Sequence, residues 1–120
     1  MRKFFFALAI ILSGCVTDRN FNQSNVCDIF KTNPQWKSYA EKTKEKWGVP
    51  VSLQLSFIKQ ESSFNRTARP PRQKVLGFIP GLRPSSAYGY SQALDGTWEE
   101  YKQSTGNYNA DRKNFADASD

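Results

Sequence analysis

Residues 51–65 read VSLQLSFIKQESSFN and form the most apolar segment that follows the N-terminal run of the chain. Apolar and polar residues alternate over its first seven positions, which is typical of a strand. The spacing of Val51, Leu55 and Ile58 instead fits one face of a helix. Because Pro50 suits the start of a helix, the sequence favours a helix that is buried on most sides.

Glu61 is the one carboxylate between residues 46 and 94. It follows Phe57 by four residues and Ile58 by three, so we expect it on the inward side of the predicted helix. Desolvation favours the protonated form of a carboxyl group, and a carboxylic acid can donate its proton to a leaving group. The alternative is a solvated helix end where Glu61 pairs with a neighbouring basic residue.

Two further helices are expected from their end signals. Asn33 as N-cap and Pro34 at the first position open one helix, which Gly48 closes. Its aromatic and small residues recur at helical spacing and predict a core-facing stripe of Trp36, Tyr39, Ala40, Thr43 and Trp47. A capping box at Thr97 predicts a shorter helix that ends at Gly106. Residues 107–120 are polar and stop without a closing signal, which predicts a truncated domain.

Residues 65–86 read as a long loop. They hold four of the six prolines and five basic residues, and no acidic residue occurs between Ser62 and Leu94. Loops of this length in compact domains are usually functional or disordered. The apolar residues 75–79 predict that the loop packs onto the body of the domain.

The N-terminus has the pattern of a targeting segment. Arg2 and Lys3 precede nine apolar residues, far fewer than the ~20 that span a bilayer. The following Leu-Ser-Gly-Cys resembles the lipobox of bacterial lipoproteins, which implies cleavage before Cys15 and its acylation. The alternative is an ordinary secretory signal with an incidental cysteine. We expect a signal peptide over 1–14, a flexible tether over 15–26 and one domain over 27–120.

Composition excludes several kinds of site. The chain has no histidine, so it offers neither a Ser-His-Asp nor a Cys-His nucleophilic site, and a zinc site is not expected. With Cys15 acylated, Cys27 has no partner within the chain and is expected to be a small buried residue. Loss of Arg2 and Lys3 would lower the net charge from +6 to +4, since 15 basic residues would face 11 acidic ones.

Two motifs at this spacing carry a family resemblance. Gln60-Glu61-Ser62-Ser63-Phe64 ends the central helix, and Ala87-Tyr88-Gly89-Tyr90-Ser91-Gln92 follows some 26 residues later. Together with the arginine- and proline-rich loop, they resemble the lytic transglycosylases of the SLT type, which are related in fold to goose-type lysozyme, and among them the small lipoprotein members. The resemblance covers about residues 27–120. It implies a mainly α, lysozyme-like domain.

The resemblance also implies the site residues. Glu61 would be the catalytic acid, and the substrate would be bound by Ser62, Ser63, Arg69, Tyr88, Gly89, Tyr90 and Gln92. The family's Gly-Leu-Met-Gln motif falls on residues 89–92, where this chain keeps the glycine and glutamine alone. No metal or cofactor is implied. The partners expected are peptidoglycan glycan strands and, through the lipid, a membrane, which we expect to be the outer membrane on its periplasmic side. Nucleic acid is not expected as a partner, and the chain is expected to be a monomer.

A single carboxylate suits a particular chemistry. Ordinary glycoside hydrolysis uses two carboxyl groups. One acid suffices where the N-acetyl group of N-acetylmuramic acid attacks its own anomeric carbon and the 6-hydroxyl then closes a 1,6-anhydro ring. Two alternatives stay open: a muramidase in which water completes the reaction, and a lipoprotein that binds peptidoglycan without cleaving it.

Overall fold

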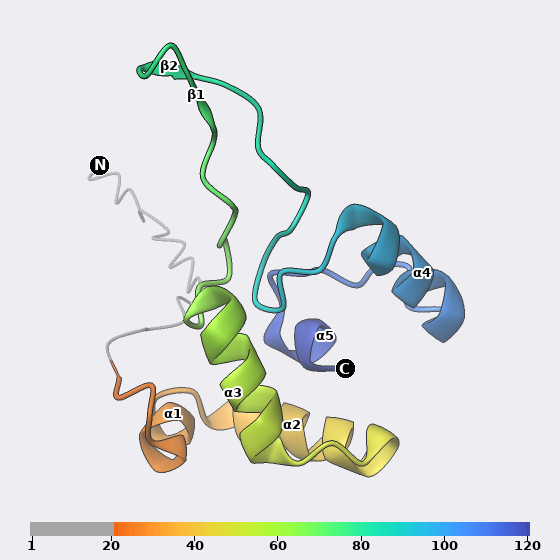
Figure 1. The fold of residues 1–120 in the computed structure, drawn as a ribbon. Helices are drawn as coiled ribbons and strands as arrows, with labels where there is room; N and C mark the ends of the chain where they lie inside the picture. Colours follow the sequence, from red (N-terminus) through yellow and green to blue (C-terminus); the bar gives the residue numbers. More distant parts are fainter. Residues whose placement is uncertain (1–20) are drawn as a thin grey trace, which may run out of the picture.

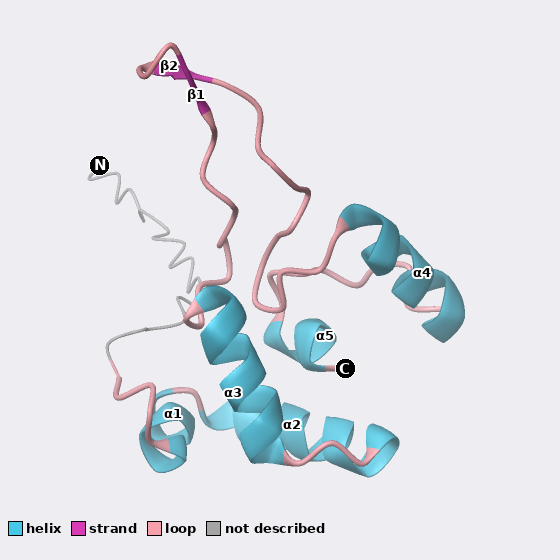
Figure 2. Cartoon of the chain, viewed as in Figure 1, coloured by secondary structure: helices cyan, strands magenta, loops and turns pink. Residues whose placement is uncertain are grey.

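The computed structural model describes residues 21–120, which form five helices and one two-stranded antiparallel sheet (Figure 1, Figure 2). The elements in chain order are α1 (Val26–Thr32), α2 (Pro34–Trp47), α3 (Val51–Ser62), β1 (Lys74–Val75), β2 (Ile79–Pro80), α4 (Asp95–Thr105) and α5 (Phe115–Ser119). The expectation of a mainly α chain is confirmed. The ambiguous segment after Pro50 is helical for 12 residues, as its helical spacing predicts.

The ends of α2 follow from local chemistry. Pro34 starts the helix, where its fixed backbone angle suits the first turn and its missing N–H costs nothing. Gly48 ends it with φ of 73°, a left-handed conformation that glycine adopts easily. Asn33 occupies the N-cap position, but its side chain makes no capping hydrogen bond.

Most of the predicted stripe on α2 faces the core, and its last member does not. Trp36, Ala40 and Thr43 are buried, whereas Trp47 is 54% exposed. Trp47 is the last residue of the helix, and its indole N–H donates to the Asp120 carboxylate at 3.1 Å on the surface. The prediction that Trp47 lies in the core is therefore wrong, because the last turn of the helix extends beyond the residues that form the core.

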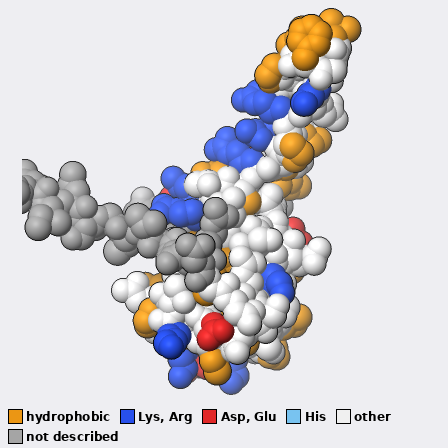
Figure 3. All heavy atoms as spheres, turned by 90° about the vertical axis from the view of Figure 1, so that its left-hand side faces the viewer, with side chains coloured by type: hydrophobic (Ala, Val, Ile, Leu, Met, Phe, Trp, Pro, Cys, Tyr) orange, Lys and Arg blue, Asp and Glu red, His pale blue; other side chains and the backbone are white. Residues whose placement is uncertain are grey.

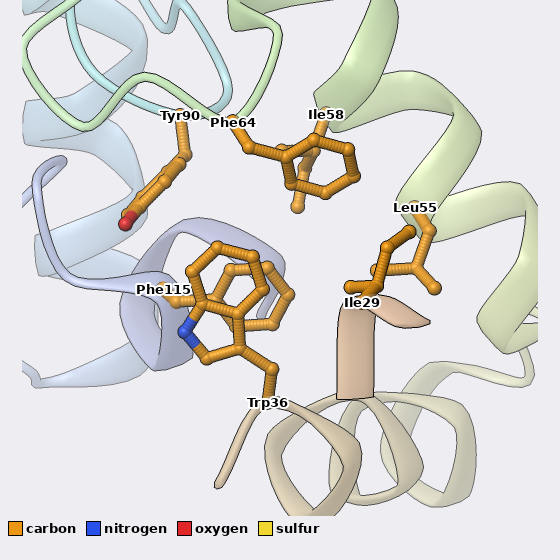
Figure 4. Close-up of a cluster of buried hydrophobic side chains, with 7 residues drawn as sticks. All are labelled: Ile29, Trp36, Leu55, Ile58, Phe64, Tyr90 and Phe115. Atoms are coloured by element: carbon orange, nitrogen blue, oxygen red, sulfur yellow. The ribbon is translucent and has the colours of Figure 1, made fainter. Parts of the chain in front are cut away.

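The core is an aromatic cluster built around Trp36 (Figure 4). Its indole stacks on Phe115 of α5 with ring centroids 4.1 Å apart and 5° between the planes. Phe64 stacks on it at 5.7 Å, and Tyr90 meets it edge-on at 5.6 Å. Ile29, Leu55 and Ile58 complete the cluster. Aromatic side chains bury large areas each, so this cluster joins four helices and two loops into one core.

Residues 70–84 form an arm that projects from the helical body (Figure 1). At its end β1 and β2 pair antiparallel, with Val75 opposite Ile79. All residues from 71 to 80 are exposed. The prediction that the apolar residues 75–79 pack onto the body is wrong, because the hairpin pairs within itself and stands clear of the helices.

The C-terminal third also differs from expectation. The helix α4 begins at Asp95, so Thr97 lies inside it and forms no capping box, while Gly106 ends it with φ of 70° as predicted. The polar stretch 107–120 contains α5, whose N-cap Asn114 accepts a hydrogen bond from the backbone N–H of Ala116. This cap turns the chain so that Phe115 enters the core.

The packed structure begins before the expected boundary at residue 27. The ring of Phe21 packs edge-on against Phe64 at 5.5 Å and against Trp36 at 6.3 Å. The last residues of the predicted tether therefore belong to the body. Cys27 is exposed on α1, which corrects the expectation that it is buried. Within residues 21–120 no helix is long and apolar enough to cross a membrane.

Candidate functional site

Glu61 lies in the last turn of α3 and is exposed to solvent, so its predicted inward position is wrong. The buried side of α3 is formed by Gln54, Leu55, Ile58 and Ser62. Phe57, four residues before Glu61, is 53% exposed and shares its outward side. Phe57 and Ile58 lie about 100° apart around the helix axis, and Ile58 is the one that packs in the core. The carboxyl group is thus accessible on a rigid helix that the core holds from the opposite face.

The residues after Glu61 end the helix in an unusual backbone conformation. Ser62 is buried, and its hydroxyl donates to the carbonyl of Ile58 at 3.0 Å. Ser63 and Phe64 both have positive φ, 49° and 57°. Such strain in residues other than glycine persists only where surrounding contacts hold it. Here the buried Phe64 ring provides the contact, and the turn leaves Ser63 exposed beside Glu61.

Gly89 and Gln92 connect the loop after α3 to the loop before α4. The Gly89 N–H donates to the carbonyl of Ala68 at 3.1 Å. The Gln92 side-chain amide donates to the same carbonyl at 2.9 Å and to the carbonyl of Gly89 at 2.7 Å. Gly89 has φ of 79°, and a Cβ placed there would lie 2.1 Å from the carbonyl oxygen of Arg112. Both residues, expected to bind substrate, thus make internal contacts that shape the loop.

Tyr90, also expected to bind substrate, is a core residue in this structure. It is 2% exposed and packs edge-on against Trp36 and Phe115, with ring centroids 5.6 and 5.7 Å apart. Its neighbour Tyr88 lies nearer the surface and faces two arginines. Of these two tyrosines, Tyr88 is therefore the one that a ligand can contact.

Tyr88 and Arg69 line a polar pocket of about 250 Å³ at the base of the arm. The guanidinium of Arg69 lies 4.1 Å from the centre of the Tyr88 ring, and that of Arg112 lies 5.4 Å from it. Arg112 is fixed by hydrogen bonds to the carbonyls of Ser86 and Ala93 and by an ion pair with Asp95 at 2.8 Å. Asp95 also lines the hollow and neutralises Arg112, so Arg69, stacked on the Tyr88 ring, is the group that suits an anionic ligand.

Arg112 is a site residue that sequence reasoning did not find. It lies in a polar stretch without a motif, and its partners are 17 to 26 residues away along the chain. The signal for it exists only in three dimensions.

An apolar cavity of about 410 Å³ lies beside α3 and is lined in part by Leu53 and Phe57. Glu61 lines neither this cavity nor the polar pocket.

The remaining predicted positions are quickly placed. Ser63 and Arg69 are exposed, and Tyr88 is partly buried. Within the described part of the chain no group of three or more His, Cys, Asp or Glu side chains could hold a metal ion. Cys15, the predicted acylation site, lies outside the described residues, as do the signal segment 1–14 and the first half of the predicted tether, residues 15–20.

The class of protein follows from comparison with known families. The model of the transglycosylase SLT domain matches residues 3–120, so the chain belongs to this family. The family resemblance is therefore confirmed, and so is the fold, because the SLT domain is lysozyme-like. Membership supports a peptidoglycan-related function of the lytic transglycosylase kind, with glycan strands as partner. Comparison with curated proteins and with solved structures found no match.

Proposed function

We propose that the chain is a peptidoglycan lytic transglycosylase in which Glu61 is the general acid and base. It would cleave the β-1,4 bond between N-acetylmuramic acid and N-acetylglucosamine and leave 1,6-anhydromuramic ends. The observation that carries the proposal is the accessible carboxyl group of Glu61 at the end of α3, in a chain that belongs to the SLT family. A catalytic acid must reach the glycosidic oxygen, and a solvent-facing carboxyl group can.

The proposed reaction has two steps that use one carboxyl group. In the first, Glu61 donates its proton to the glycosidic oxygen while the N-acetyl carbonyl oxygen bonds to the anomeric carbon and the N-acetylglucosamine alcohol leaves. In the second, the Glu61 carboxylate takes the proton of the 6-hydroxyl of the same sugar. The oxygen of that hydroxyl bonds to the anomeric carbon and displaces the N-acetyl oxygen, which opens the ring formed in the first step. A glycan lying over Glu61 would displace water from the carboxyl group and bring the glycosidic oxygen within its reach.

The pocket at the base of the arm supports the choice of substrate. Peptidoglycan stem peptides carry carboxylates, and Arg69 beside Tyr88 offers a charged group with an aromatic floor. We therefore assign Arg69 and Tyr88 to the stem peptide. We also propose that Cys15 is acylated and that the protein is anchored in the bacterial cell envelope, at the outer membrane facing the periplasm.

The test is Glu61→Gln, which keeps the shape of the side chain and removes its acid. Loss of general acid catalysis should lower the rate of muropeptide release from sacculi at least ~10²-fold, about 2.7 kcal/mol of barrier. Binding to sacculi and the melting temperature should stay near those of the parent, because the side chain is exposed and supports no core contact. Glu100→Gln, the same change at an exposed position on α4, is the matched control and should leave the rate unchanged.

The products separate this proposal from its alternatives. Mass spectrometry of the released muropeptides should find anhydromuramic ends, which are one water lighter than the reducing ends that a muramidase makes. Sacculi that bind the parent protein and release nothing would identify a binding protein. Activity of Glu61→Gln within about tenfold of the parent would move the catalytic acid to another residue.

A further inference from the structure

The end of the arm is an exposed apolar cluster that the rest of the domain does not cover. We define the arm tip by four large apolar residues and their exposed fractions: Val75 (52%), Leu76 (79%), Phe78 (76%) and Ile79 (43%). Leu82 (84%) is also exposed and lies next to the tip, in the stem. Single exposed apolar residues are ordinary, whereas a contiguous group marks a surface that meets another apolar phase. Figure 3 shows these side chains covering the end of the projection.

The arm tip is held in place by a hydrogen-bonded stem. The N–H of Gln73 donates to the carbonyl of Leu82 at 3.1 Å, and the N–H of Gly81 donates to the carbonyl of Gln73 at 2.7 Å. The side chain of Arg72 donates to the carbonyl of Gly81 at 3.3 Å. The stem therefore closes below the tip, and the outward position of the apolar residues belongs to a defined hairpin.

Leu76 lies in the turn at the end of the arm. Its φ of 54° is in the left-handed region, which costs energy for any residue with a Cβ and suits glycine or asparagine better. Its side chain is 79% exposed, so contacts within the domain offset little of that energy. This positive φ belongs to the three-residue turn between β1 and β2, and the turn presents the Leu76 side chain to solvent.

The charges of the arm change along its length. Arg72 and Lys74 come before the tip in the chain and Arg83 follows it, and no acidic residue occurs between residues 62 and 94. Figure 3 shows Lys and Arg side chains along the projection. An apolar end followed by a band of positive charge matches the order of layers in a membrane, where acyl chains lie beneath anionic headgroups. Peptidoglycan carboxylates would match the charges, but they offer no apolar phase for the tip.

We propose that the arm tip inserts into an anionic phospholipid surface while Arg72, Lys74 and Arg83 contact the lipid phosphates. Apolar residues of both strands and of the turn are exposed together, which suits a fluid that surrounds the tip better than a groove that covers one face. The insertion is shallow, because backbone groups in the turn still require water or headgroups as partners. This contact is independent of catalysis at Glu61.

The test reads the environment of the tip directly. The full chain carries Cys15→Ala and Cys27→Ser, so that one introduced cysteine takes an environment-sensitive fluorophore, either at Leu76→Cys or at Gln103→Cys on α4 as control. With vesicles of phosphatidylglycerol and phosphatidylethanolamine, the label at position 76 should shift to shorter wavelength and become protected from aqueous iodide. The label at position 103 should do neither. With vesicles of phosphatidylcholine alone, both labels should stay accessible.

Charge variants of the chain labelled at position 76 test the basic band. Since each basic residue near an anionic surface contributes about 1 kcal/mol, replacing Arg72, Lys74 and Arg83 by glutamine should lower the vesicle partition coefficient roughly 100-fold. The same three-charge loss on the helical body, at Lys31, Lys37 and Lys42, should change it only a few-fold. A position 76 label as accessible to iodide as the label at 103, an equal response to phosphatidylcholine, or protection by purified sacculi in place of vesicles would overturn the proposal.

Discussion

Gly89→Ala tests whether the first residue of the family's Gly-x-x-Gln pattern is needed for the fold. Its φ of 79° would cost alanine ~1–2 kcal/mol. The new Cβ would also lie 2.1 Å from the carbonyl oxygen of Arg112, so the two strands of chain must separate. That movement breaks the bond from Gly89 to Ala68 and the bond from Tyr90 to Arg112, each worth ~0.5–1.5 kcal/mol.

The sum is a loss of ~2–5 kcal/mol, against a total stability of ~5–15 kcal/mol for a domain. For a domain of ~100 residues this lowers the melting temperature by at least ~8 °C. Thermal unfolding followed by circular dichroism measures the shift.

Two other glycines separate the causes of the loss. Gly48→Ala has the same backbone strain, with φ of 73°, and open space around the new methyl group, so it should lose ~1–2 kcal/mol. Gly96→Ala lies in α4 with no atom within 4 Å and should gain up to ~1 kcal/mol from helix propensity. A Gly89→Ala protein that melts like Gly48→Ala would refute the close approach to Arg112, and one that melts like Gly96→Ala would refute the strain as well.

Three further results are expected. Burial, the hydrogen bond to Asp120 and the charge of that carboxylate raise the pKa of Tyr101 from 10.0 to about 12, so its contribution to stability is full below pH 10.0 and is lost as the pH rises through about 12. Tyr101→Phe should therefore remove that part of the fall in melting temperature at high pH. Identical pH profiles of the melting temperature for the parent and Tyr101→Phe would contradict this. Arg69→Gln should weaken binding to intact murein more than to peptide-free glycan strands, whereas equal weakening would indicate a structural role. Cys15→Ala should release the protein from the membrane fraction after a high-salt wash, and retention would speak against the anchor.

The sequence predicts what is decided within a few residues. Pro34 and Gly48 bound α2 as expected, and the helical spacing after Pro50 outweighs the alternation that suggested a strand. The orientation of α3 could not be read in the same way. Phe57 and Ile58 are both apolar neighbours, and only the position of the aromatic core decides that Ile58 turns inward. The exposure of Glu61 follows from that choice.

Other features depend on contacts between distant parts of the chain. Phe115 stacks on Trp36 across 79 residues of sequence, and the short α5 that delivers it is too brief for periodicity to reveal. The arm misled prediction for the opposite reason, because apolar residues ordinarily pack and those of residues 75–79 do not. Propensity and pattern describe what a residue prefers, and they do not say whether the fold provides a partner.

At its C-terminal end, the helix α3 places two neighbouring residues in different environments: Ser62 is buried and Glu61 is exposed. Ser62 is turned inward, and its hydroxyl bonds back to the carbonyl of Ile58, so it can share a buried face with Leu55. Glu61 is turned about 100° away and reaches solvent. In the proposed mechanism Glu61 takes part in the chemistry and Ser62 supports the structure, which gives a distinct expectation for each residue. Ser62→Ala should act on stability, Glu61→Gln on turnover, and a protein in which both changes acted on turnover alone would need a different account of this helix.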